Sequence, residues 1–331
     1  MTTTPDRTAP EPTVLDLGLP DPVRDPDLPA RVRIHEVGAR DGLQNEGTLV
    51  PVDVKAEFIA RLAAAGLRTV EATSFVHPKW VPQLADAEEL MPRLADLPGR
   101  HPGLRLPVLV PNERGLDRAL AHHAGEVAVF ASATETFARR NLNRSADEAM
   151  AMFRPVVERA TAAGVPVRGY LSMCFGDPWE GPVPIAQVVR HGLALLEMGC
   201  AELSLGDTIG VATPGQVKAL LDEFTRTGVP IDRIAVHFHD TYGQALSNTL
   251  AALRSGVTVV DASAGGLGGC PYAKSATGNL ATEDLVWMLH GLGIETGVDL
   301  AALAETSGWM ARQLGRPSPS RTVRALLGPT A

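Results

Sequence analysis

The stretch ELSLGDTIGVATPGQVKALLDEFTRTGVPIDRIAVHFHDTYGQALSNTLAALRSGVTVVDA (202–262) decides the fold, because it alternates short apolar runs with longer segments of helical periodicity. The apolar runs predict three β-strands, at Glu202–Leu205, Arg233–His239 and Val257–Ala262. The segments between them predict two helices, at Pro214–Thr227 and Gln244–Ser255. Strand-helix-strand units in series indicate a parallel sheet covered by helices.

The same alternation continues on both sides of this stretch. Five earlier strands are predicted, at Val32–Val37, Thr69–Thr73, Leu106–Val110, Glu126–Ala131 and Pro166–Ser172. Further helices are predicted at Val54–Ala65, Ala85–Leu94, Asp147–Ala163, Ile185–Met198 and Thr282–Gly291. Eight strands over about 260 residues favour an α/β fold of the (β/α)8 TIM-barrel type over an open doubly wound sheet of about six strands. The alternative is a Rossmann-type sheet with an added lobe, but no Gly-x-Gly-x-x-Gly follows an early strand.

Composition limits the function classes that fit the chain. The 331 residues are 45% hydrophobic and carry a formal net charge of −8, the wrong sign for binding nucleic acid or an anionic membrane surface. No run approaches the roughly 18 apolar residues of a membrane helix. The three cysteines, Cys174, Cys200 and Cys270, form no Cys-x-x-Cys pair, so neither a disulfide framework nor a structural zinc site is predicted. We therefore expect a protein of a reducing compartment, the cytoplasm.

The two ends of the chain differ in composition from its middle. Residues 1–30 are rich in proline and acidic residues and predict a disordered tail, which resembles neither an Arg-rich transit peptide nor a secretory signal. Residues 31–298 are the predicted barrel domain, and residues 299–331 a C-terminal helical extension and tail.

The sharpest chemical signal is VHFHD (236–240) at the end of the seventh predicted strand. On a strand, residues two apart point to the same side about 6.6 Å apart, so His237 and His239 can bind one ion. Asp41, after the first strand, would share the same mouth, because the carboxyl ends of parallel strands meet there. With an amide oxygen such as that of Asn279, this donor set suits Mg²⁺ or Mn²⁺, with zinc as the competitor. The alternative is a pair of structural histidines.

Two further features lie at the predicted mouth. Arg40 presents a planar fork of donors, suited to a carboxylate or a developing enolate oxygen, although an ion pair with Glu71 is also plausible and both can hold at once. GGLGGCP (265–271) has four glycines in five positions, which predicts a loop. Such a loop could carry Cys270 over the mouth as a lid, or simply form a turn beside an incidental thiol.

Six segments together resemble the 3-hydroxy-3-methylglutaryl-CoA lyase family. The similarity extends from about Arg33 to Val298 and is strongest in VGARDGLQNE (37–46), EATSFVHPKWVPQLAD (71–86), GVPVRGYLSMCFGDPWEG (164–181), ELSLGDTIGVATPG (202–215), HFHDTYGQALSNTLAAL (237–253) and GGLGGCPYAKSATGNLATEDLVWMLHGLGIETGV (265–298). The resemblance implies a TIM-barrel carbon-carbon lyase that cleaves 3-hydroxy-3-methylglutaryl-CoA to acetoacetate and acetyl-CoA.

Carried over by position, the resemblance implies roles for seven residues. It makes Asp41, His237, His239 and Asn279 ligands of Mg²⁺ or Mn²⁺, Arg40 a catalytic residue that contacts substrate, and Cys270 and Glu71 catalytic residues. It also implies an acyl-CoA substrate and a homodimer. Asp207 matches a further acidic position of the family.

Departures from the family pattern keep related activities open. Gly47 stands where lysine commonly follows Glu46, so a related 3-hydroxy-3-alkylglutaryl-CoA such as the isohexenyl compound is an alternative substrate. A Claisen-condensing synthase of the isopropylmalate type is another alternative, although such proteins usually carry a long C-terminal regulatory region. Barrel hydrolases usually place the His-x-His pair on the first strand instead.

Overall fold

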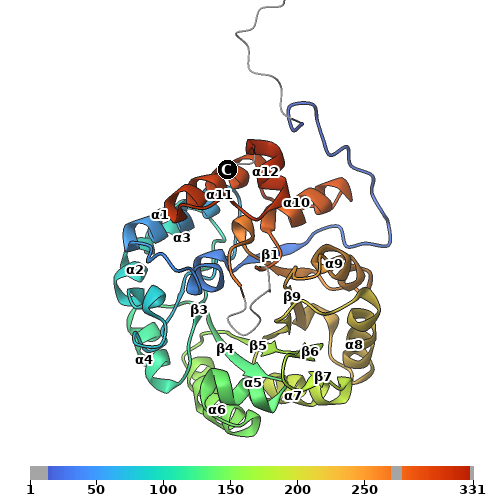
Figure 1. Ribbon diagram of the computed structural model, residues 1–331. Helices are drawn as coiled ribbons and strands as arrows, with labels where there is room; N and C mark the ends of the chain where they lie inside the picture. Colours follow the sequence, from blue (N-terminus) through green and yellow to red (C-terminus); the bar gives the residue numbers. More distant parts are fainter. Residues whose placement is uncertain (1–13, 270–277, 329–331) are drawn as a thin grey trace, which may run out of the picture.

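Eight parallel strands form one sheet in a computed structural model of the chain, which describes residues 14–269 and 278–328. Around the sheet they follow the order β1-β10-β9-β8-β5-β4-β3-β2, which is chain order around a ring. Their bounds are β1 (Arg33–Glu36), β2 (Thr73–Ser74), β3 (Val108–Leu109), β4 (Val127–Ser132), β5 (Val167–Ser172), β8 (Glu202–Asp207), β9 (Ile234–Phe238) and β10 (Val259–Ala262). The predicted α/β architecture of TIM-barrel type is confirmed (Figure 1).

The two ends of the sheet meet through residues that precede β2. The Glu36 N–H donates to the Thr69 carbonyl at 2.9 Å, and the Glu71 N–H donates to the Glu36 carbonyl at 2.8 Å. The predicted strand Thr69–Thr73 therefore lies in the right place, but its regular part is short. One physical reason is that Pro107, on the neighbouring strand, has no N–H to donate to the ladder.

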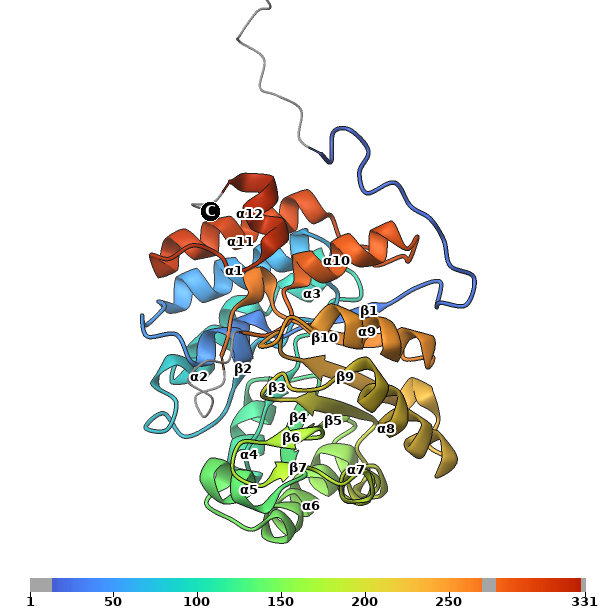
Figure 2. The ribbon, with the colours of Figure 1, turned by 45° about the vertical axis from the view of Figure 1, so that its right-hand side comes forward.

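Helices surround the sheet, as Figures 1 and 2 show from two directions. Those following the strands are α1 (Val52–Ala64), α2 (Ala87–Leu94), α3 (Leu97–Arg100), α4 (Glu113–Ala121), α5 (Glu135–Leu142), α6 (Ala146–Ala162), α7 (Ile185–Met198), α8 (Pro214–Arg226), α9 (Ala245–Arg254) and α10 (Thr282–Gly291). Their apolar faces pack on the sheet. For example, α7 buries Val188, Leu195 and Leu196.

Several short elements were not predicted, among them α3, α4, α5 and a hairpin of β6 (Gly176–Asp177) and β7 (Gly181–Pro182). The helix α5 buries only Phe137 and Ala138, too few apolar positions for a recognisable helical period. The helix α4 is likewise rich in charge, and its start is fixed by the Asn112 side chain, which accepts from the Gly115 N–H at 3.0 Å.

Segments outside the ring pack on its α1 and α10 side. The helices α11 (Leu300–Leu314) and α12 (Arg321–Leu327) pack on each other, and α11 also contacts α1 and α10. On the N-terminal side, Leu28 is buried and the Val23 N–H donates to the Gly291 carbonyl at 2.9 Å. None of the described helices combines the length and apolar character needed to cross a membrane.

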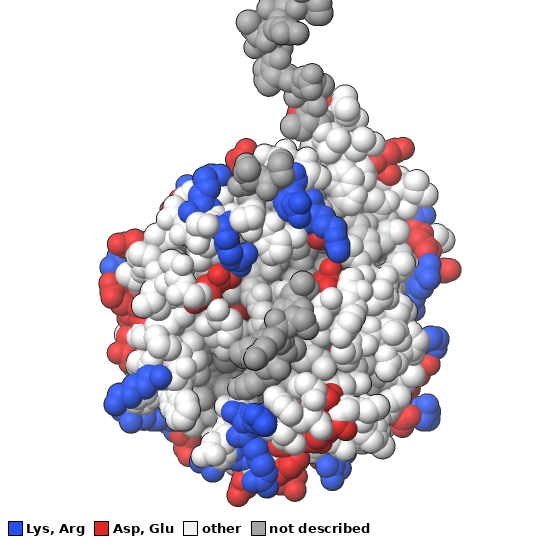
Figure 3. Space-filling model, viewed as in Figure 1, with Lys and Arg blue, Asp and Glu red and all other residues white. Residues whose placement is uncertain are grey.

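The face seen in Figure 3 carries acidic and basic side chains side by side around its edge. Two arginines of the C-terminal segment form ion pairs with acidic residues in loops that follow strands. Arg316 pairs with Glu46 in the loop after β1, and Arg321 pairs with Asp240 in the loop after β9, at 3.3 Å. The C-terminal segment is thus attached to loops at the carboxyl ends of two strands.

Candidate metal centre

The strand β1 runs directly into a single turn of π-helix, η1 (Gly38–Gly42), which carries Arg40 and Asp41. This turn lies tightly against the loop after β10. A Cβ atom on Gly42 would lie 2.8 Å from the Ser263 Oγ and 2.9 Å from the Leu267 Cβ, closer than real Cβ contacts. Glycine at position 42 is therefore required for the close approach that brings Asp41 beside the last strand.

The strand β9 supplies the two histidines. His237 lies within β9, and His239 follows its last residue, with ring centroids 5.3 Å apart. His239 pairs through its backbone with Asn279, in an isolated antiparallel bridge. The bridge places Asn279 next to the histidines.

Asp41, His237 and His239 converge as the pattern of strand ends predicts. One potential ligand atom from each of them lies within 4.8 Å of the others. Asn279 joins the same group, because its Nδ2 donates to Asp41 Oδ2 at 2.9 Å and to the Leu267 carbonyl at 3.1 Å.

The chemistry of these donors fits a divalent cation. Asn279 Oδ1 and His239 Nδ1 are buried, and neither has a hydrogen-bond partner among the residues that the structure describes. A buried polar atom without a partner is costly, and a bound ion is one way to satisfy it. Two imidazoles, a carboxylate and an amide oxygen form a hard to borderline donor set.

The charges around the centre keep Asp41 ionised. Burial alone would raise the pKa of Asp41, but the Arg40 guanidinium and the two imidazoles outweigh burial and lower it to about 2. For His239, burial and the nearby His237 both disfavour the protonated ring and lower its pKa to about 4. Asp41 is thus a carboxylate and His239 a neutral imidazole at pH 7, the protonation states that metal ligands need.

Arg40 lies between two carboxylates. Its Nη1 donates to Asp41 Oδ1 at 2.7 Å, and its Nε donates to Glu71 Oε2 at 2.9 Å. Burial disfavours the charged guanidinium, but Glu71 and Asp41 overcome this and raise the pKa of Arg40. The expected Arg40–Glu71 ion pair is present, and it fixes the direction of the guanidinium.

Asp207, at the end of β8, shapes the loop that follows. Its carboxylate accepts from the Val211 N–H at 2.9 Å and from the Ala212 N–H at 3.0 Å. Burial raises its pKa to about 6, against the effect of these two donors. In this structure Asp207 therefore organises the β8 to α8 loop.

Three residues that the sequence did not single out are linked to the centre by hydrogen bonds. Asp261 of β10 accepts from His237 Nδ1 at 3.3 Å, and Arg168 of β5 donates to Asp261 at 2.6 Å. The Tyr170 hydroxyl donates to Glu71 Oε2 at 3.2 Å. Polar residues two apart on the predicted strand Pro166–Ser172 were the available signal, because they share one face and barrel interiors are usually aliphatic.

Cys270 lies outside the described residues. The helix α5, which follows β4, carries Arg139 and Arg140 in its last turn. Arg139 pairs with Glu135 at 2.6 Å, and the Arg140 guanidinium lies 4.4 Å from the centroid of the Trp179 ring.

The fold and the site together define the chain as a TIM-type barrel with a candidate divalent-metal centre at the carboxyl ends of its strands. The family model described as HMGL-like matches residues 31–309. The chain belongs to this family.

Known proteins support the same assignment. The chain is 52% identical over 299 residues to the mitochondrial hydroxymethylglutaryl-CoA lyase of Arabidopsis thaliana, covering 90% of this chain and 63% of that one. It is 51% identical to the cytoplasmic 3-hydroxy-3-methylglutaryl-CoA lyase of Danio rerio, covering 91% of this chain and 88% of that one. The chain thus spans less than two thirds of the plant protein and most of the fish protein.

Solved structures are similar as well. A hydroxymethylglutaryl-CoA lyase from Pseudomonas aeruginosa matches with a TM-score of 0.87 and 47% identity, over 91% of this chain and 99% of that chain. An HMG-CoA lyase from Acinetobacter baumannii, solved in complex with coenzyme A and 3-methylmalate, matches with a TM-score of 0.84 and 35% identity, over 92% and 97%.

Proposed function

We propose that the chain cleaves 3-hydroxy-3-methylglutaryl-CoA to acetoacetate and acetyl-CoA in a retro-Claisen reaction. The observation that carries the proposal is the convergence of Asp41, His237 and His239 at the mouth of a barrel of the HMGL-like family. In this reaction the tertiary hydroxyl loses its proton and the bond between C2 and C3 breaks. The electron pair of that bond forms the enolate of acetyl-CoA, which then takes up a proton at carbon.

Asp41, His237, His239 and Asn279 would hold the cation, for which Mg²⁺ or Mn²⁺ suits the donor set. When bound, such a cation supplies positive charge that acidifies the substrate hydroxyl and orients a carboxylate. The proton acceptor would be His237 or a water molecule held at the centre. Asp261, bonded to His237 Nδ1, would stabilise the imidazolium that forms.

Arg40 would stabilise the enolate. Its guanidinium is held by Glu71 and Asp41, so its donors are oriented before substrate arrives and need little reorganisation. Glu71 acts through Arg40 in this proposal. Its Oε1 is buried without a hydrogen-bond partner among the described residues, which leaves it able to accept a further donor.

Cys270 would deliver or relay the proton to the enolate carbon, since a thiol near a cation and a guanidinium can exchange protons near neutral pH. We expect Cys270→Ser to lower turnover while leaving the metal content nearly intact. An unchanged steady-state rate would remove Cys270 from the mechanism.

We assign residues 31–298 to the catalytic barrel and residues 299–331 to a C-terminal extension, with a homodimer as the working assembly. The substrate is an acyl-CoA, supported by the coenzyme A bound to the Acinetobacter baumannii relative. The cytoplasm is the proposed location. Relatives carry both mitochondrial and cytoplasmic names.

The direct experiment is to mix the purified chain with 3-hydroxy-3-methylglutaryl-CoA and Mg²⁺ and to measure acetoacetate. The isohexenyl analogue is the comparison substrate, because Gly47 leaves one positive charge fewer near the mouth than the family pattern has. Acetoacetate formation that EDTA abolishes would support the proposal. No product from the methyl substrate, with product from the analogue, would assign the chain to the related lyase.

A further inference from the structure

Arg168 is an unusual residue for the inside of a barrel. It belongs to β5, its side chain is 1% exposed, and it is among the largest fully buried side chains of the described residues. Barrel interiors are normally filled by valine, isoleucine and leucine. Burying a charge is costly, and a buried ion pair rarely stabilises a fold more than apolar residues of the same volume would. A role in positioning other groups would explain why arginine occupies this place.

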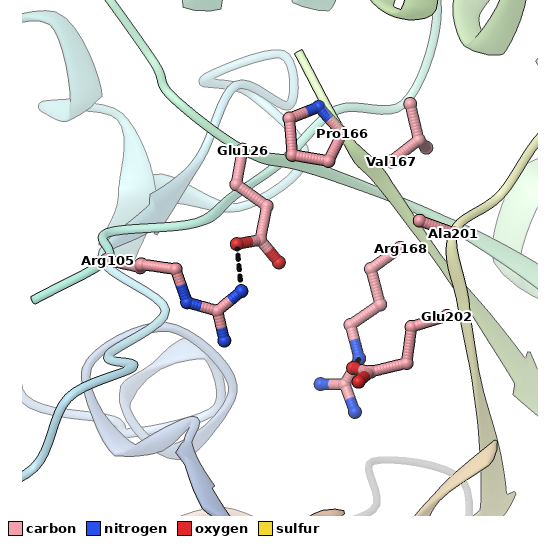
Figure 4. A pocket seen from close by; sticks show the side chains of 7 residues that line it. All are labelled: Arg105, Glu126, Pro166, Val167, Arg168, Ala201 and Glu202. Carbon is pink, nitrogen blue, oxygen red and sulfur yellow. Dashed lines mark hydrogen bonds and ion pairs between the residues drawn. The ribbon is translucent and has the colours of Figure 1, made fainter. Parts of the chain in front are cut away.

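The guanidinium is held from two sides. Its Nε lies 2.9 Å from Glu202 Oε1, and its Nη2 donates to Asp261 Oδ1 at 2.6 Å. On the side of Glu202 lies a cavity of about 170 Å³, lined also by Arg105 and Glu126 (Figure 4). Figure 4 shows the Arg168 guanidinium beside the Glu202 carboxylate, while the Arg105–Glu126 pair lies apart from it. Arg168 thus contacts both Glu202, which lines the cavity, and Asp261.

Asp261 continues this connection to the candidate metal centre. It is fully buried in β10, directly opposite His237 in the β10 to β9 register. Its Oδ1 accepts from Arg168, while its Oδ2 accepts from the Ser204 hydroxyl at 3.0 Å and lies 3.3 Å from His237 Nδ1. Three neighbours on three strands therefore fix this carboxylate.

We propose that Asp261, clamped by Arg168 and Ser204, is a positioning residue that holds His237 in the Nδ1–H tautomer. A carboxylate accepts hydrogen bonds but donates none, so the proton of the ring must lie on Nδ1. Nε2 then carries the free lone pair, which is available to bind the cation together with Asp41 and His239. Partners of this kind typically change metal affinity 10- to 100-fold.

The test compares three variants with the wild type. Asp261→Asn keeps the shape of the side chain but can present an amide N–H to His237, which permits the wrong tautomer. Ser204→Ala removes one contact to the carboxylate at little risk to the fold. Glu126→Gln is the matched control, because it changes a buried carboxylate on the same cavity that bonds Arg105 and makes no contact with Asp261.

Two readouts apply to the protein before any substrate is added. Calorimetry with Mn²⁺ should show a dissociation constant raised about 10- to 100-fold by Asp261→Asn and by a few fold by Ser204→Ala, with no change for Glu126→Gln. Nitrogen-15 NMR of the imidazoles should show His237 protonated on Nδ1 in the wild type and in Glu126→Gln, and mixed in Asp261→Asn. The clamp is refuted if folded Asp261→Asn retains the wild-type affinity and tautomer. If Asp261→Asn does not fold, a wild-type Mn²⁺ affinity in Ser204→Ala refutes it instead.

The inference rests on the proposed metal centre, but its failure is distinguishable from failure of the proposed reaction. A wild type that binds Mn²⁺ and releases no acetoacetate contradicts the reaction and leaves the comparison of variants intact. A wild type that binds no Mn²⁺ contradicts the centre and, with it, the clamp.

Discussion

Gly42→Ala is expected to loosen the metal centre without changing any proposed ligand. The added Cβ would lie 2.8 Å from the Ser263 Oγ and 2.9 Å from the Leu267 Cβ, so the turn η1 and the loop after β10 must move apart. Overpacking of this kind costs about 1 to 3 kcal/mol. Replacing glycine with alanine also lowers the conformational entropy of the unfolded chain, which stabilises the folded protein by about 0.4 to 1 kcal/mol. We therefore expect a net loss of roughly 1 to 2 kcal/mol in the free energy of unfolding.

The same displacement should weaken ion binding. Asp41 precedes Gly42, and Asn279, which bonds Asp41, also bonds the Leu267 carbonyl. If binding must restore the native spacing, each 1.4 kcal/mol of strain costs a tenfold change in affinity. The Mn²⁺ dissociation constant should rise about 5- to 30-fold, measured by calorimetry, while urea unfolding followed by circular dichroism measures the stability.

Gly47→Ala is the matched control. A Cβ at Gly47 would have no heavy atom within 4 Å, so stability should stay the same or rise slightly and Mn²⁺ affinity should not change. Wild-type stability and affinity in Gly42→Ala would contradict the argument that this close approach sets the geometry of the centre.

Three further predictions concern the centre, pH dependence and packing. His239→Ala should remove the bound metal after dialysis, and full occupancy by elemental analysis would contradict its assignment as a ligand. Burial raises the pKa of Glu283 from 4.5 to about 8, so the stability that its protonated form contributes is complete below pH 4.5 and is lost as the pH rises through 8. Thermal unfolding of Glu283→Gln should accordingly depend less on pH between 5 and 9 than that of the wild type, and equal slopes would count against a buried neutral acid. Gly192→Ala would place a Cβ 2.6 Å from the Phe224 ring and should lower the free energy of unfolding by about 1 to 2 kcal/mol in urea titrations. Gly215→Ala, on an open helix surface, should not destabilise the protein. Similar values for the two variants would disprove the packing argument.

The fold could be predicted because the periodicity of the apolar residues and the local composition change together along the chain. The helices Ile185–Met198 and Thr282–Gly291 begin and end in the structure where the sequence predicts, since their apolar positions repeat at helical spacing. Strand ends were less certain near proline. Pro107 interrupts the pairing of the second and third strands in a way that local hydrophobicity does not reveal.

The sequence predicted the residues of the candidate site that lie at strand ends. It did not predict those that reach the site from inside the barrel, because their side-chain directions depend on how the strands pair. Asp41, His237 and His239 follow from the rule that carboxyl ends of parallel strands meet. Asp261 lies within the predicted strand Val257–Ala262 with no motif around it, and its bond to His237 depends on the register of two strands. Register is a tertiary property that one strand's sequence does not specify.

The donors of the candidate centre come from opposite ends of the chain: Asp41 follows the first strand, and Asn279 lies beyond the last. During synthesis, most of the ring could therefore assemble around an incomplete coordination sphere. A ribosome that has polymerised only the first 230 residues has made neither histidine, and the amide donor is added still later. The cation would then bind only when the chain is nearly complete. A product terminated before the histidines would lack the ligands that the cation needs.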